Sequence, residues 1–218
     1  METILVFKVS DLYLWLIIKF LMEEIIKIAT KMFITLGFKS VTMDDVAAKM
    51  GISKKTIYKY FENKEKLIEA SVNFVHQEIH DKMAAIFNQD KNAVEENFIM
   101  REMFNEMFKS DGDSPVYQLK KHYPLIFAKV HHQESIQCKE IFTTNVLKGI
   151  EQGYYKKEIN VEQTVLFYYM LIFGINENFQ TEKEVNKLEL AALLYHTNAI
   201  ATPKGIAELE KQLQNHTL

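Results

Sequence analysis

Lys55 and Lys59 are the residues whose type and spacing point most directly to a binding chemistry. They are four residues apart, so on a helix they share one face, and their ammonium groups can bind oxygens that are anionic or accept hydrogen bonds. Ile57 and Phe61, also four apart, share the other, apolar face. Lysines on an amphipathic helix can be no more than a solvated surface, so the surrounding elements have to decide between the two interpretations.

The residues around these lysines predict two short helices joined by a tight turn. Thr42 and Asp45 have the spacing of a capping box at the start of the first helix. Gly51 ends that helix, and Ser53 is the expected N-cap of the second, Lys54–Phe61. A pair of this kind with a basic outer face is typical of a helix-turn-helix that lies in the major groove of DNA.

An amphipathic helix is predicted upstream, over residues 23–36. Its apolar residues recur at three- and four-residue spacing: Ile25, Ile28, Ala29, Met32 and Leu36. Gly37 follows, where a left-handed cap favours a residue without Cβ, and we expect Phe38 to fold back on Phe33. The three helices would form a small head.

The stretch from about Ile25 to Leu67 resembles the DNA-binding domain of the tetracycline-repressor (TetR) family. The family pattern has Tyr-x-x-Phe, here Tyr58-Lys59-Tyr60-Phe61, and a Lys-Glu pair before a Leu, here Lys64-Glu65-Lys66-Leu67. The match covers about a fifth of the chain, and the remainder is similar only in its helical character.

The resemblance implies DNA contacts at matching positions: Thr42, Lys54, Lys55, Thr56, Tyr58, Lys59, Tyr60 and Lys64. Tyr58, Tyr60 and Lys64 match a phosphate clamp at the start of the next helix, whose dipole also favours an anion. Lys55, Thr56 and Lys59 are candidates for base edges, since lysine donates to guanine O6 and N7. Many relatives have a small residue where this chain has Lys55, so the base preference stays open.

The charge distribution agrees with this division of the chain. Residues 23–66 contain nine lysines and six acidic residues, a balance of +3, whereas the whole chain carries −3. Residues 1–22 balance to zero, so residues 67–218 carry −6. A basic head on an acidic body suits DNA binding, because phosphate neutralisation supplies most of the non-specific affinity.

Composition favours an all-α fold, with a three-helix DNA-binding head at 23–67 and a larger regulatory and dimerisation body at 68–218. Apolar residues make up 48% of the chain, with only three prolines and seven glycines. The single cysteine, Cys138, rules out an internal disulfide and fits a reducing, cytoplasmic location.

Residues 1–22 are an extension before the head. The apolar run Leu12–Ile18 lies among charged residues and is shorter than the roughly 20 residues that span a bilayer, so we predict no stable membrane insertion. TetR-like heads usually begin only a few residues before the first helix. Met22 is therefore an attractive true start, with residues 1–21 the product of an over-extended gene start. An extra helix on the body and membrane association are the alternatives.

Beyond Leu67 the chain predicts further helices separated by loops at Asp90-Lys91 and Ser110–Pro115. Their approximate ranges are 64–88, the segment between these two loops, 124–152, 161–179, 184–200 and 203–214.

Two features of this body have both a structural and a functional interpretation. A Met- and Phe-rich stripe is core by default, yet the resemblance implies a pocket for a small apolar or amphipathic inducer. Its candidate lining residues are Met103, Met107, Tyr123, Phe127 and Tyr168. The apolar helices 161–179 and 184–200 are buried core or, as the resemblance favours, a homodimer interface. A single recognition helix reads only a few base pairs, which also requires a two-fold dimer.

No enzyme, cofactor or metal site is predicted. His76 and His80 have a spacing that can chelate zinc, but no Cys or acidic cluster completes the site. A glycine-rich phosphate loop and a Gly-x-Ser-x-Gly elbow are both absent from the sequence.

The sequence therefore predicts a dimeric transcriptional repressor, released from a palindromic operator in double-stranded DNA by a small-molecule inducer. The alternatives are a DNA-binding co-regulator controlled by a protein partner and a helical membrane-proximal interaction protein.

Overall fold

The computed structural model describes residues 9–110 and 112–215. Within these ranges the backbone forms ten α-helices and two isolated β-bridges but no strand, which confirms the all-α prediction. The helices are α1 (Val9–Leu36), α2 (Met43–Met50), α3 (Lys54–Tyr58), α4 (Lys64–Phe87), α5 (Ala93–Met107), α6 (Pro115–His122), α7 (Pro124–Glu151), α8 (Val161–Asn178), α9 (Glu182–Ile200) and α10 (Pro203–Asn215). No helix in the described ranges is both long and apolar enough to cross a membrane.

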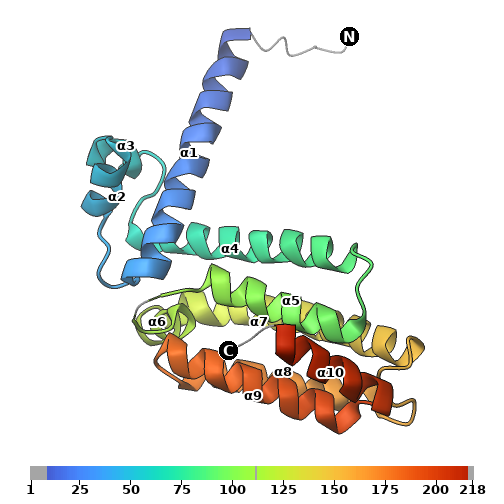
Figure 1. Cartoon of the computed structure of the whole chain (residues 1–218). Coiled ribbons are helices and arrows are strands. Elements are labelled where there is room, and N and C mark those ends of the chain that lie inside the picture. The colour runs from blue at the N-terminus through green and yellow to red at the C-terminus, as the bar shows by residue number, and fades with distance from the viewer. Residues whose placement is uncertain (1–8, 111, 216–218) are drawn as a thin grey trace.

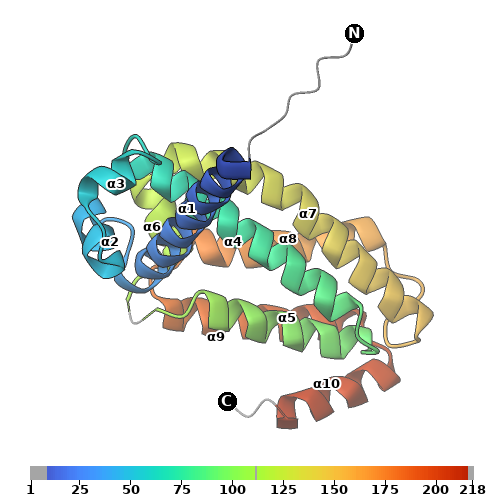
Figure 2. The ribbon, with the colours of Figure 1, turned by 90° about the horizontal axis from the view of Figure 1, so that it is seen from above.

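The helices form a small head on a larger body (Figure 1). α1 rises away from the body with α2 and α3 at its side, while α4 runs from the foot of α1 across the top of the body. Seen from above, α2 and α3 lie at the end of the body that holds α6, and α10 lies toward the other end (Figure 2). α4 belongs to both parts, since it begins in the head and ends at α5.

The core of the head consists of the apolar faces predicted from the sequence. Ile25, Ala29 and Phe33 of α1 are buried in one cluster with Val46 of α2 and Ile57 of α3. Burying a side chain of this size contributes about 1.5–3 kcal/mol, so these contacts hold the short helices against α1. α3, with five residues, is too short to persist without such packing.

Local signals fix the connections within the head. Gly37 has a φ of 94°, and the rings of Phe33 and Phe38 stack with centroids 5.5 Å apart, as predicted. The capping box of α2 is also confirmed. Thr42 Oγ1 accepts from the Asp45 amide at 3.2 Å, and the Asp45 carboxylate accepts from the Thr42 amide at 2.8 Å.

In the head, two helix bounds differ from the predicted ones. α1 begins at Val9 instead of residue 23, so the described part of the extension continues α1 and does not form an extra helix on the body. Its large apolar side chains between Leu12 and Phe20 are exposed. α3 ends at Tyr58 instead of Phe61, because the chain tightens there: the Tyr60 amide donates to the Ile57 carbonyl, three residues back.

α6 was not predicted, because Ser110–Pro115 was interpreted as a loop and the residues after it show little apolar periodicity. Pro115 occupies the first turn, where its missing N–H has no consequence. Pro124 separates α6 from α7, since proline restricts the residue before it and cannot donate to the α6 carbonyls.

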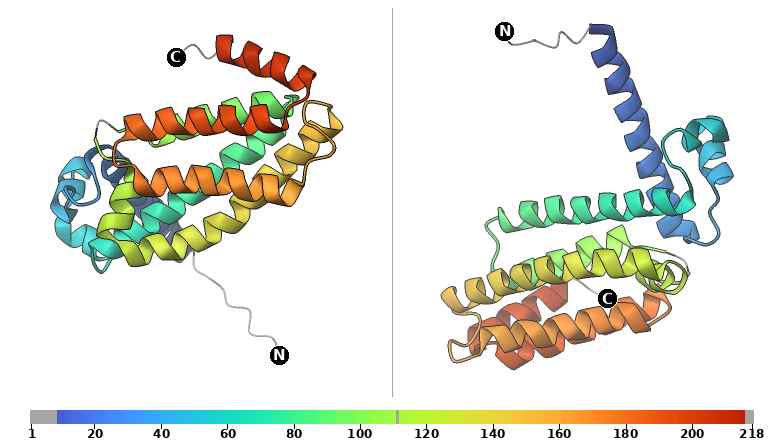
Figure 3. Two further views of the ribbon diagram at one scale, coloured as in Figure 1. Left: turned by 90° about the horizontal axis from the view of Figure 1, so that it is seen from below. Right: turned by 180° about the vertical axis from the view of Figure 1, so that it is seen from behind.

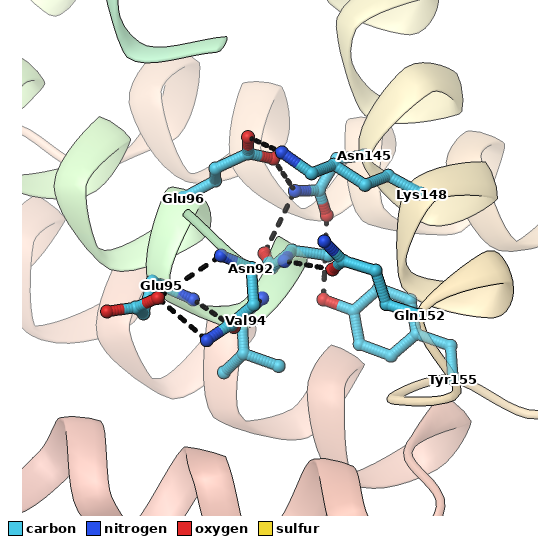
Figure 4. A network of polar contacts seen from close by, with 9 residues as sticks. Asn92, Val94, Glu95, Glu96, Asn145, Lys148, Gln152 and Tyr155 are labelled. Carbon is cyan, nitrogen blue, oxygen red and sulfur yellow. Dashed lines mark hydrogen bonds and ion pairs between the residues drawn. The ribbon is translucent and has the colours of Figure 1, made fainter. Parts of the chain in front are cut away.

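A buried polar network ties the start of α5 to α7 (Figure 4). Glu96 is fully buried, and its carboxylate accepts from Lys148 Nζ at 2.6 Å and from Asn145 Nδ2 at 3.1 Å. The Asn145 amide also donates to the Ala93 carbonyl at 2.9 Å. Tyr155 Oη accepts from Asn97 at 3.1 Å, and burial raises the pKa of the phenol above its usual value.

The face of α8 and α9 that points away from the head is not covered by another element of the described chain (Figure 3). Its α8 part is apolar, with Phe167 62% and Met170 60% exposed beside Leu166 and Leu171. On α9, Tyr195 is exposed. Large contiguous apolar surfaces are uncommon on monomers and mark interaction sites.

Candidate nucleic-acid interface and internal cavity

The exposed face of α3 carries the predicted basic residues. Ser53 caps the helix, accepting from the Thr56 amide at 3.1 Å, and Ile57 anchors it in the core. This orientation leaves Lys55 and Lys59 exposed on the outer side. Neither lysine makes an ion pair with any residue that the structure describes, so both ammonium groups are available to an anion.

Tyr58 and Tyr60 flank this basic face at different depths. Tyr58 is exposed, whereas Tyr60 is half-buried against the head core. Both precede α4, where Asn63 caps the helix by accepting from the Lys66 amide at 2.9 Å. The positive end of the α4 dipole therefore lies close to the tyrosines.

The remaining predicted contacts have partners within the head. Lys54 Nζ lies 2.6 Å from an Asp44 oxygen, and this hydrogen bond raises the pKa of the lysine. Lys64 Nζ donates to the Lys39 carbonyl at 3.2 Å, and partial burial lowers its pKa.

The two predicted hydroxyl contacts are also engaged. Thr42 Oγ1 donates to the Asp45 carboxylate at 2.7 Å, and the Thr56 and Ser53 hydroxyls lie 2.8 Å apart. A DNA contact from these groups would have to compete with the internal hydrogen bonds. Among the predicted DNA contacts, the exposed side chains without such competition are Lys55, Tyr58 and Lys59.

A cavity of about 200 Å³ lies between the head and the body. Side chains from α1 and from α4 to α9 line it, and most are apolar. Phe33 and Phe38 of the head core line it, together with Phe127 of α7, which packs against that core. The cavity therefore reaches the core of the head.

The five predicted pocket residues lie in four places. Phe127 lines the cavity, and Tyr168 lines a smaller one of about 60 Å³ nearby. Met103 and Met107 pack instead in the cluster around Met83 between α4 and α5. Tyr123 contacts the head, with its ring edge-on to Phe38.

The polar groups of the cavity were not predicted from the sequence. Glu189 accepts from Asn176 Nδ2 at 2.6 Å, and burial raises the pKa of its carboxyl. Glu182 is 7% exposed, and burial, followed by the nearby Glu189, raises its pKa to about 7. Inward-facing glutamates at helical spacing resemble a solvated face in the sequence, so no signal identified them.

Gln118 of the unpredicted α6 connects the head to the body. Its Oε1 accepts from the Phe38 amide at 3.1 Å, and its Nε2 donates to the Asp113 carbonyl at 2.9 Å. Gly37 lies so close that a Cβ there would be 2.6 Å from Gln118 Oε1. The end of α1 is thereby held against α6.

Glu182→Gln should stabilise the protein at pH 8 by about 1–3 kcal/mol and have almost no effect near pH 4.5. The carboxyl titrates near 4.5 in the unfolded chain and near 7 in the folded protein. The folded state therefore binds the extra proton between these values, and stability falls as pH rises through this window. Urea unfolding of both proteins at the two pH values checks this. An equal difference at both pH values would contradict the role of the charge.

The basic helix-turn-helix and the cavity-bearing helical body together define the class of the protein: a DNA-binding regulator. Residues 25–71 match the family model of bacterial regulatory proteins of the tetR family. This match makes the head a TetR-family DNA-binding domain and the protein a DNA-binding transcriptional regulator; TetR-family proteins are regulators and not enzymes.

Other transcriptional regulators are similar to this protein over most of the chain. The probable HTH-type transcriptional regulator ArpR of Pseudomonas putida is 22% identical over 162 residues, 70% of this chain and 76% of ArpR. The HTH-type transcriptional repressor KstR2 of Mycolicibacterium smegmatis is 21% identical over 159 residues, 66% of this chain and 72% of KstR2. The crystal structure of a transcriptional regulator from Cytophaga hutchinsonii is 22% identical with a TM-score of 0.67, covering 83% of this chain and 98% of that one, and shares the fold.

Proposed function

We propose that the protein is a homodimeric repressor that leaves a palindromic operator when a small apolar or amphipathic molecule occupies the cavity. The observation that carries this proposal is the composition of the cavity wall. Phe33 and Phe38 belong to the head core and also line the cavity. Val72 and Ile79 of α4 line it too. A bound molecule would touch the head directly.

The proposed mechanism is a change in the separation of the two heads. A dimer places two recognition helices about 34–36 Å apart, one turn of DNA. A ligand that fills the cavity would shift α4, and the Gln118 link to Phe38 would carry the displacement to the end of α1. A coupling of about 1–3 kcal/mol is typical between two such sites. A co-regulator that is controlled by a protein partner would not require an internal apolar cavity.

The apolar face of α8 supports the proposed dimer. Phe167, Met170 and Leu171 would be buried against the partner subunit, together with the exposed side of α9 around Tyr195. Gly174 has open space where a Cβ would stand, so a partner helix can approach α8 closely there.

On the operator, Lys55, Thr56 and Lys59 would face base edges in the major groove, and Tyr58, Tyr60 and Lys64 would contact phosphates. Their positions around α3 and the start of α4 support these roles. Lys54 and Thr42 would contribute at the edge of this surface, with the charge of Lys54 compensated by Asp44.

Fluorescence anisotropy with labelled DNA from upstream of the protein's own gene, over a salt series, tests the proposal. We expect tight, salt-dependent binding that scrambled competitor DNA does not remove. Equal loss to scrambled DNA would contradict a specific operator in that fragment. No binding at low salt would contradict DNA binding by this protein.

Lys59→Ala should weaken operator binding and lower the slope of log affinity against log salt by about one, because one fewer counterion is displaced. The same titration of Lys157→Ala, which removes an exposed lysine from the body, should match the unmodified protein. Unchanged affinity and slope in Lys59→Ala would show that this lysine does not contact DNA.

A further inference from the structure

One wall of the cavity is acidic. Glu182, Asn186 and Glu189 line the cavity, and they follow one another along α9 at spacings of four and three residues, so they share one side of the helix. A third glutamate, Glu177 of α8, also lines it. Of the described residues that form the lining, none is a lysine or an arginine.

The three glutamates differ in how their charge is compensated. Glu177 lies 2.9 Å from Lys120 Nζ and 2.7 Å from His131 Nε2, both measured to its carboxylate. Glu189 accepts the hydrogen bond from Asn176. The carboxylate of Glu182 has no hydrogen-bond or ion-pair partner among the residues that the structure describes.

The unpartnered state of Glu182 is unfavourable, because a buried carboxylate loses its hydration. The first turn of α9 offsets part of this loss through the helix dipole. Thr181 and Glu184 already form the cap of this helix, with the Thr181 hydroxyl donating to the Glu184 carboxylate at 2.7 Å. Capping therefore does not explain Glu182, and its charge faces the cavity.

The rest of the wall suits a bulky apolar group. Phe104, Phe108 and Phe173 are among the aromatic residues that line it, and aromatic faces attract cations. Ser71 Oγ and Asn186 Oδ1 are buried atoms of lining residues, and neither has a hydrogen-bond partner in the described chain. Both can accept a hydrogen bond from a ligand N–H.

We propose that the cavity binds a hydrophobic organic cation, an aromatic or alkyl body that carries a protonated or quaternary nitrogen, with this nitrogen beside Glu182. The inference rests on the proposed inducer-controlled function and names the chemical class of its ligand. An anion of the same shape would face the glutamates without a lysine or an arginine on the wall. The basic residues of the lining are His76, His80 and His131, and His131 already lies against Glu177. A neutral molecule would leave Glu182 uncompensated.

Three probes with one apolar body test the charge preference: 4-phenylbutylamine, 4-phenylbutanol and 4-phenylbutyrate. Isothermal titration calorimetry on the full-length protein without DNA, at about pH 8, measures each affinity. We expect the amine to bind at least about tenfold more tightly than the alcohol, and the acid to bind most weakly.

The variant Glu182→Gln tests whether Glu182 causes the preference for the amine. It should weaken amine binding by about tenfold and leave alcohol binding within about threefold, because the shape is conserved and only the charge is lost. Glu106→Gln, an exposed position on α5 with the same change in net charge, should leave both affinities unchanged. Thermal unfolding of each variant confirms that it is folded.

Three results would overturn the proposal: tighter binding of the alcohol or the acid, amine binding that Glu182→Gln does not weaken, or no binding of any probe. Fluorescence anisotropy of labelled operator, measured as each probe is added, distinguishes failure of the proposed ligand class from failure of the proposed inducer-controlled function. An amine that binds through Glu182 without releasing DNA supports the ligand class and contradicts its role as inducer. Release by the alcohol or the acid alone supports induction and contradicts the ligand class.

Discussion

Lys148→Met should lower the free energy of unfolding by about 3–5 kcal/mol, the range measured when one partner of a buried ion pair is removed. Glu96 is 0% exposed, and Lys148 is its one cationic partner among the described residues. Methionine keeps most of the side-chain volume and removes the charge, which leaves the Glu96 carboxylate with only the Asn145 amide.

Urea unfolding at neutral pH and fixed protein concentration measures this effect, since the stability of a dimer depends on concentration. Lys27→Met is the matched control: this lysine pairs with Glu24 on the surface of α1, where an ion pair contributes about 0–1 kcal/mol. Adding Glu96→Gln to Lys148→Met should recover much of the loss. A loss in Lys148→Met no larger than that in the control would show that the pair is not important for stability.

Phe167→Asp combined with Met170→Asp should convert the proposed dimer to monomers and weaken operator binding by at least about a hundredfold. Two buried carboxylates in an apolar interface would be strongly unfavourable. Each monomer would then bind a single half-site, without the gain from simultaneous engagement of the second.

Sedimentation velocity at micromolar concentration and operator anisotropy measure the two effects. Leu125→Asp on α7 is the control, because Leu125 is 86% exposed and lies outside the α8–α9 face. We expect it to remain dimeric and to bind DNA normally. A double variant that still sediments as a dimer would place the interface on another surface.

The head could be predicted from the sequence because its determinants are local. The Gly37 cap, the Thr42–Asp45 capping box and the Ser53 cap each involve residues within four positions of one another. Ile57 then specifies which side of α3 is buried, so the basic face follows directly.

The cavity could not be predicted in the same way, because seven helices contribute to its wall. Met103 and Phe127 are both large apolar residues on helices, yet only Phe127 lines the cavity. The difference depends on how α5 and α7 are rotated in the fold. Glu182 and Gln118 are polar residues on helices, and nothing local separates them from surface residues until their neighbours are known.

The cavity wall formed by Phe33, Phe38 and Leu119 is also part of the hydrophobic core of the head. This double use restricts how the protein can evolve. A substitution that reshapes the wall for a new ligand also repacks the domain that holds α3, so a change in ligand preference near α1 carries a penalty in head stability. The α9 side of the cavity has no such restriction, and diversification among descendants of this protein should concentrate there.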